Sequence, residues 1–199
     1  MKKLIVFLVL LMPMIVIAQN NEIASSSKQT TFEKFSSTIG TIVKFKDYKL
    51  TSVSSKIGSG LAATHYTVRA EVRQLIIDNN KTLFLHLTYQ GYQEPKRSAF
   101  IAMEDVVEIE KALTELIKQC ESDSTGDAYY LENKFSTKDN FDIGYYIETT
   151  VDKKGEESNE LRWYVTLDDR YNHSTAFFLE PDGLRDLFKT AIQKMNELK

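Results

Sequence analysis

The sequence has little of the residues that cross-link or interrupt small domains. Its 199 residues include one cysteine, Cys120, and three prolines. A single cysteine excludes an intramolecular disulfide, so a hydrophobic core must hold the fold together. We expect Cys120 to pack inertly in that core, because it falls on the apolar side of a predicted helix. A nucleophilic thiol is the alternative.

An excess of basic charge is also lacking. The chain has 25 Lys and Arg residues against 28 Asp and Glu residues, which gives a formal net charge of −3 at pH 7. Proteins that bind nucleic acids usually concentrate basic residues on one face and are basic overall. We therefore expect no nucleic acid among the partners of this protein, and its composition points to no cofactor.

Long apolar runs are confined to the N-terminus. Lys2 and Lys3 precede an apolar run over residues 4–17, which ends at the small Ala18 before a polar stretch. This pattern is typical of a signal peptide that is cleaved after Ala18. An uncleaved anchor is the alternative, although the run is shorter than the roughly 20 apolar residues of a spanning helix. We expect an exported protein, periplasmic or extracellular, that begins at Gln19 and keeps no stable membrane anchor.

The chain divides into four segments on this interpretation. Residues 1–18 are the signal peptide and residues 19–29, rich in Asn and Ser, are a flexible leader. Residues 30–121 form a first half and residues 122–199 a second half. Each half is long enough to contain several strands and a helix.

The first half reads as a short helix, four strands and a longer helix. Thr30 and Glu33 have the spacing of a capping box. Apolar residues that alternate with polar ones predict strands at 43–46, 66–73 and 83–89, followed by a short strand at 98–103. Residues 52–64 are expected to be a loop. A stripe of apolar residues from Val106 to Cys120 then predicts an amphipathic helix that lies on a sheet.

The second half repeats this order of elements. Strands are predicted at 128–135, 143–151, 161–167 and 174–179, and a helix begins at Pro181 with an apolar stripe from Leu184 to Leu198. The pattern favours an α+β fold of two tandem units, each a four-stranded antiparallel sheet plus a helix, with a short N-terminal helix. An internal duplication would explain the repeat, and the alternative is that two antiparallel sheets followed by helices resemble each other by chance. Whether the halves share one sheet stays open.

If the halves are equivalent, Leu85 and Trp163 occupy matching core positions. Each is then expected beneath the helix of its own half, Leu85 under the stripe that begins at Val106 and Trp163 under the stripe that begins at Leu184. Both side chains should be buried.

Candidate metal ligands are few. The histidines His65, His86 and His173 belong to three different segments, and we expect each of them to be a surface residue. The densest polar group contains Asp168, Asp169 and His173, whose carboxylate and imidazole groups could hold a divalent cation. A solvated turn explains the same residues, because Asp and Asn favour turns.

Three aromatic residues fall on the nominally polar faces of their strands. They are Phe84, Tyr146 and Tyr164. Exposed aromatic rings can anchor a partner protein or stack on a sugar, so these residues are candidate binding residues. The alternative is that loops or the other half of the protein cover this face.

Three segments carry a resemblance to known sequences. The run from Gly40 to Leu50, the segment from Ser98 to Val106 and the segment from Tyr130 to Phe135 resemble a group of exported proteins of Bacteroidetes bacteria. The resemblance spans most of the chain after the predicted signal peptide. It implies export and a shared fold, but the group has no established activity that could be carried over.

The missing catalytic motifs favour an exported, non-catalytic protein that binds a macromolecule or ligand of unknown identity. A secreted metal-dependent or hydrolytic enzyme, using Asp168, Asp169 and His173, is the first alternative. The second is a carrier of an apolar ligand, with a cavity between the sheet and its helices.

Overall fold

The structure is a computed structural model that describes residues 29–38, 40–57, 64–91, 94–168 and 174–199. The predicted signal peptide and residues 19–28 of the leader lie outside the described residues. The elements are α1 (Thr31–Ser36), β1 (Val43–Lys49), β2 (Val53–Ile57), β3 (Thr64–Ile77), β4 (Asn80–Tyr89), β5 (Arg97–Ala102), α2 (Met103–Cys120), β6 (Tyr130–Ser136), β7 (Asp142–Val151), β8 (Glu157–Asp168), β9 (Ser174–Phe178) and α3 (Pro181–Leu198).

Both halves contribute to one antiparallel sheet. Within the described residues its strand order is β1-β3-β4-β5-β8-β7-β6, while β2 also pairs with β3 and β9 with β8. The halves meet between β5 and β8, where Ser98 is paired with Asp168. The α+β class predicted from the sequence is therefore confirmed, and the open question of a shared sheet is answered.

The first residues of two helices confirm local predictions, and one predicted loop is corrected. The Thr30 hydroxyl accepts a hydrogen bond from the Glu33 backbone N–H, and the Glu33 carboxylate accepts one from the Thr30 backbone, so the capping box is complete. Pro181 begins α3, as expected of a residue that donates no backbone hydrogen bond. The predicted loop over residues 52–64 is partly wrong, because Val53–Ile57 forms strand β2 against β3.

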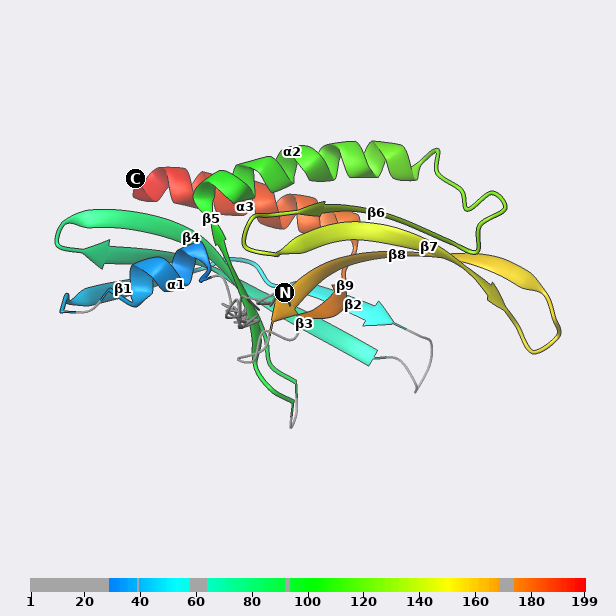
Figure 1. Ribbon diagram of the computed structural model, residues 1–199, viewed down its shortest axis with the longest axis horizontal. Coiled ribbons are helices and arrows are strands. Elements are labelled where there is room, and N and C mark those ends of the chain that lie inside the picture. Colours follow the sequence, from blue (N-terminus) through cyan, green and yellow to red (C-terminus); the bar gives the residue numbers. More distant parts are fainter. Residues whose placement is uncertain (1–28, 39, 58–63, 92–93, 169–173) are drawn as a thin grey trace, which may run out of the picture.

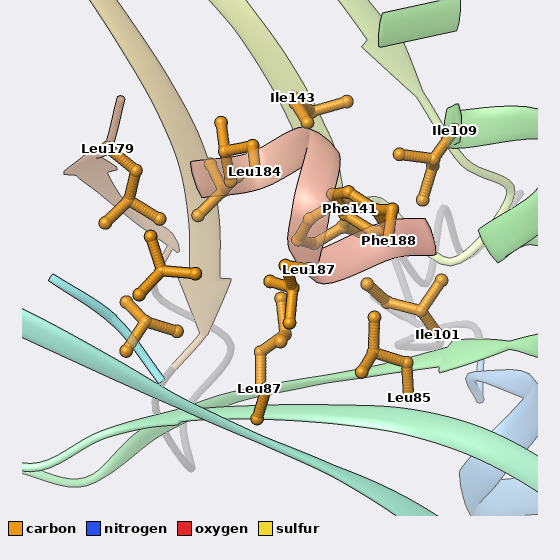
Figure 2. Packing of buried hydrophobic residues seen from close by; sticks show 14 of the residues in the cluster. Leu85, Leu87, Ile101, Ile109, Phe141, Ile143, Leu179, Leu184, Leu187 and Phe188 are labelled. Carbon is orange, nitrogen blue, oxygen red and sulfur yellow. The ribbon is translucent and has the colours of Figure 1, made fainter. Parts of the chain in front are cut away.

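The main core lies between the sheet and helices α2 and α3. The predicted helix stripes are buried, including Val106 and Ile109 of α2 and Leu184 and Phe188 of α3. Figure 2 shows side chains of α3 gathered in one cluster with side chains of β4, β5 and β7. These packed side chains make up the layer between the sheet and its helices.

The helices do not each cover their own half. Helix α3 contacts β2 and β3 of the first half, and α2 extends from β4 and β5 over β6 and β7 of the second (Figure 1). Trp163 is buried, as predicted, and lies beside Cys120 at the end of α2. A helix stripe identifies which side chains need burial but not which strands bury them, since any apolar sheet face satisfies the requirement.

The opposite side of the sheet, called the outer face below, carries the short helix α1. Because side chains alternate along a strand, Leu85 points to the main core and Phe84 to the outer face. There Leu75, Phe84 and Ala102 form a second, smaller core, against which Phe32 of α1 packs. The outer face of the first half is therefore partly covered by the segment that follows the leader.

Candidate functional site

The expected exposure of the candidate aromatic residues is wrong for two of the three. Phe84 is 0% exposed and Tyr164 5% exposed, while Tyr146 is half-buried. The ring of Phe84 is covered by Phe32 of α1, at a centroid distance of 5.3 Å. Tyr164 pairs across the strands with Gly144 and its hydroxyl donates a hydrogen bond to Glu132. These two rings therefore serve packing on the outer face.

His86 is not the surface residue that the sequence predicted. Its side chain lies on the outer face of β4 and the residue is only 2% exposed. The imidazole stacks on the ring of Phe100 at a centroid distance of 4.1 Å, and Phe32 stacks on Phe100 at 3.6 Å. His65, by contrast, is exposed as expected, and His173 lies outside the described residues.

The Glu71 carboxylate contacts His86 and is linked in turn to Arg73 and Asp47. The Nδ1 atom of His86 lies 2.5 Å from Oε1 of Glu71, its direct partner across β3 and β4. Arg73 forms a two-pronged ion pair with Asp47, with both N–O distances 2.7 Å, and also reaches Glu71 at 3.3 Å. The hydrogen bonds from Arg73 lower the pKa of Asp47. The four side chains form one connected network across three strands.

Burial, more than this network, decides the direction in which the pKa of His86 moves. Burial is the largest effect and lowers the pKa of His86 below its usual value of 6.5, although the hydrogen bond with Glu71 acts in the opposite direction. The imidazole is therefore neutral at pH 7. Because its short contact is with a carboxylate oxygen, Nδ1 carries the proton and Nε2 keeps its lone pair. The ring thus has a hydrogen-bond acceptor with a fixed orientation.

His86 borders a cavity of about 770 Å³ on the outer face, at the junction of the two halves. The cavity is lined by α1, by the outer faces of β3, β4 and β5, by the end of β8, and by the connection between β6 and β7. Its polar lining residues include Thr30, Arg73, Lys96, Ser98, Thr166 and Asp168. This volume is in the usual range of small-molecule sites, about 300 to 1,000 Å³.

The lining has donors, acceptors and charges of both signs. Lys96 is exposed and forms no ion pair within the described part of the chain. Asp139 anchors α1 by accepting a hydrogen bond from the backbone N–H of Thr31 at 3.0 Å. The Thr166 hydroxyl accepts a hydrogen bond from the backbone N–H of Asp142 at 2.9 Å. Its own O–H group can therefore donate to a different acceptor. The site suits a ligand that both donates and accepts hydrogen bonds.

The predicted metal site is only partly visible. Asp168 lines the cavity, whereas Asp169 and His173 lie outside the described residues. In the described ranges, no three His, Cys, Asp or Glu side chains are grouped so that they could hold a metal ion.

Cys120 packs half-buried against the main core. Burial, together with the nearby Asp123, raises the pKa of its thiol. A raised pKa disfavours the reactive thiolate, in keeping with a packing role.

A signal for the His86 network was present in the sequence. A turn of two residues, Asp78 and Asn79, pairs Ile77 with Asn80, and counting back along both strands places Glu71 opposite His86. Phe84 had no such signal, because its burial depends on α1, which is distant in sequence and whose docking no local pattern specifies.

Comparison with known proteins adds no assignment. No model of a known protein family matches the chain, and no curated protein matches it significantly. Among the described residues, no helix is both long and apolar enough to span a membrane.

Proposed function

We propose that this chain is an exported, non-catalytic binding protein that holds a small, neutral, hydroxyl-rich ligand of the sugar class in the outer-face cavity. The observation that carries the proposal is the buried His86, whose Nδ1 lies 2.5 Å from Oε1 of Glu71 and which borders a cavity of about 770 Å³. A buried side chain with this orientation is pre-organised to accept a hydrogen bond.

Hydroxyl groups fit the lining better than a charged group does. A sugar hydroxyl can donate to Nε2 of His86 and accept from the ammonium group of Lys96. Arg73 is already neutralised by Asp47 and Glu71, and carboxylates of Glu33, Asp139 and Asp168 also line the cavity, so no single sign of charge dominates. A strongly charged ligand would meet like charges on one side.

The aromatic lining supports contact with ring edges rather than ring faces. Phe100 is stacked between His86 and Phe32, so both faces of its ring are covered. Polar contacts must therefore supply most of the specificity. This favours a compact ligand with many hydroxyl groups over a flat aromatic one.

The binding proposal is tested with a panel of neutral mono- and disaccharides, measured first by thermal shift and then by calorimetric titration. A ligand at 100 times its Kd should stabilise the protein by about 2.7 kcal/mol. We expect Lys96→Ala and Ser98→Ala each to weaken the affinity about three- to tenfold, which corresponds to the loss of one hydrogen bond. Lys111→Ala, on the exposed side of α2, is the matched control and should leave the affinity unchanged.

The same titration repeated at several pH values tests the role of His86. Because the pKa of His86 is lowered below 6.5, the affinity should hold from pH 8 to about pH 6.5 and fall at lower pH, as Nε2 becomes protonated. Binding of sugar phosphates or fatty acids instead of neutral sugars would contradict the proposal. So would Lys96→Ala and Ser98→Ala variants that bind the sugar as tightly as the unmodified protein does.

One observation favours the hydrolytic alternative. An imidazole oriented by a carboxylate is also the arrangement of a general base, which takes a proton from water or a hydroxyl group. Product analysis after incubation with the bound sugar distinguishes the two functions, because a binding protein returns the ligand unchanged. Titration with zinc, calcium and manganese covers the metal-dependent version, and tight stoichiometric binding lost in Asp168→Ala would support it.

Export is part of the proposal and rests on the N-terminal sequence pattern and on the resemblance to exported proteins. N-terminal sequencing of the protein recovered outside the cytoplasm should give Gln19 as the first residue. Recovery of the chain in a membrane fraction with Met1 intact would contradict cleavage.

An internal duplication is also proposed. Its support is the order of elements, since β3, β4 and β5 precede the 18-residue α2 as β7, β8 and β9 precede the 18-residue α3. In both series each strand pairs with the next one. The crossed positions of α2 and α3 are compatible with two equivalent units that exchange their helices.

A further inference from the structure

The two ends of the sheet carry different edge strands. In the described part of the chain, β1 lies at one end and β6 at the other. An edge strand presents unpaired backbone groups that another chain can pair with, and lysine residues are a common protection against this. Strand β1 contains Lys44, Lys46 and Lys49. Strand β6 has only Lys134 and is not protected in the same way.

The sequence of β6 is complementary to itself. If two copies pair antiparallel about Asn133, Glu132 of each copy lies directly opposite Lys134 of the other. The same register places Leu131 opposite Phe135 on the helix-covered face, and Tyr130 opposite Ser136 on the outer face. Pairs of opposite charge and of apolar residues stabilise neighbouring strands, and both occur twice in this two-fold arrangement.

Strand β1 provides the contrast. The equivalent two-fold pairing of β1 about its central residue places Lys46 directly opposite Lys46 of the other copy. Like charges in directly opposite positions destabilise strand pairing. Of the two edges, β6 is therefore the one whose chemistry permits a second copy.

Exposed aromatic rings lie at the beginning of β6. Tyr129, which precedes the strand, is 70% exposed, and Tyr130, its first residue, is 41% exposed. Leu131 and Phe135 are partly buried and pack against the main core. A second copy in this register would cover the exposed tyrosines and would extend the apolar layer across the junction.

The charged residues of β6 have bonding capacity left. Glu132 accepts a hydrogen bond from Tyr164 at Oε1, and a carboxylate can accept several. Lys134 pairs with Asp142 at 3.0 Å, which uses one of the three N–H donors of an ammonium group. Neither internal contact prevents a pair between copies.

We propose that the protein forms a two-fold symmetric dimer in which β6 pairs with β6 of a second copy, centred on Asn133. The contact joins the two sheets into one continuous sheet. Because a single strand pair buries less surface than the roughly 1,200 to 2,000 Å² of a stable complex, the dimer is weak and depends on concentration.

Sedimentation velocity from about 10 µM to about 1 mM tests the dimer with charge variants. The unmodified protein should shift from monomer to dimer as its concentration rises. Lys134→Glu places carboxylates opposite each other and should abolish the shift. Lys46→Glu makes the same change of charge on β1 and should leave the shift unchanged. A monomer at every concentration, or a dimer that Lys46→Glu rather than Lys134→Glu disrupts, overturns the proposal.

A cross-link tests the register independently of charge. Tyr130→Cys and Ser136→Cys are combined with Cys120→Ser, so that position 120 contributes no thiol. Six residues of a strand span about 20 Å, so cysteines at positions 130 and 136 of one copy cannot bond to each other. Oxidation should give covalent dimers from the combined variant and much less from Ser136→Cys with Cys120→Ser. Equal cross-linking of both, or none from the combined variant, overturns the register.

Discussion

Replacing Phe84 with alanine is expected to lower the free energy of unfolding by about 3 to 5 kcal/mol, although the residue lies on the outer face. Its ring is completely buried between Phe32 of α1 and the strands of the first half. The substitution removes a large apolar side chain and leaves a cavity that Leu75 and Ala102 cannot fill. Urea unfolding monitored by circular dichroism measures the loss.

Two variants calibrate the Phe84 result. Leu85→Ala, on the opposite side of the same strand, should cost about 2 to 5 kcal/mol because it opens the main core. Phe45→Ala removes an aromatic ring from the same outer face, but Phe45 is 46% exposed. This variant should therefore lower the free energy of unfolding by about half as much as Phe84→Ala, or less. If Phe84→Ala cost less than about 1 kcal/mol, α1 would not be packed on the sheet in solution.

Gly144→Ala is expected to cost at least about 2 kcal/mol, more than is usual for the addition of one methyl group. A Cβ atom at this position would lie 2.3 Å from the carbonyl oxygen of Asn133 and 2.8 Å from the Cα atom of Lys134. Both neighbours are backbone atoms of β6, so the strand must move away from β7. The variant should unfold at a lower urea concentration and show weaker β-sheet circular dichroism.

Gly183→Ala is the control for Gly144→Ala. The added Cβ atom would approach only Cγ1 of Val53, at 3.1 Å, and alanine favours a helix over glycine by about 1 kcal/mol. The net change should therefore stay within about 1 kcal/mol in either direction. Equal stability of Gly144→Ala and the unmodified protein would contradict the pairing of β6 with β7 on which the proposed dimer depends.

Much of the fold could be predicted because its local patterns are strong. The capping box at Thr30, the start of α3 at Pro181 and the buried stripes of both long helices depend on residues within a few positions of each other. The hairpins follow from alternation and turn residues. Each of these features is decided by short-range sterics and hydrogen bonding, which the sequence expresses directly.

The candidate site was harder to predict because its parts come from distant segments. Alternation showed that Phe84 and His86 share a face of β4, and the polar residues around them suggested that this face meets water. The structure buries both, because α1 covers the face and Glu71 with Arg73 satisfies the polar groups. A period of two identifies which side chains share a face, but it does not tell whether another element covers that face.

The sequence by itself determined the kinds of elements, their order and the residues that each must bury. It also contained the cross-strand pair of Glu71 and His86, once the turn before β4 was recognised. Only the tertiary structure decided that the halves share one sheet through Ser98 and Asp168, that the long helices cross between the halves, and that a cavity lies beside His86. The physical reason is that burial is non-directional: an apolar stripe requires a partner surface, and the packing of the whole chain selects which one.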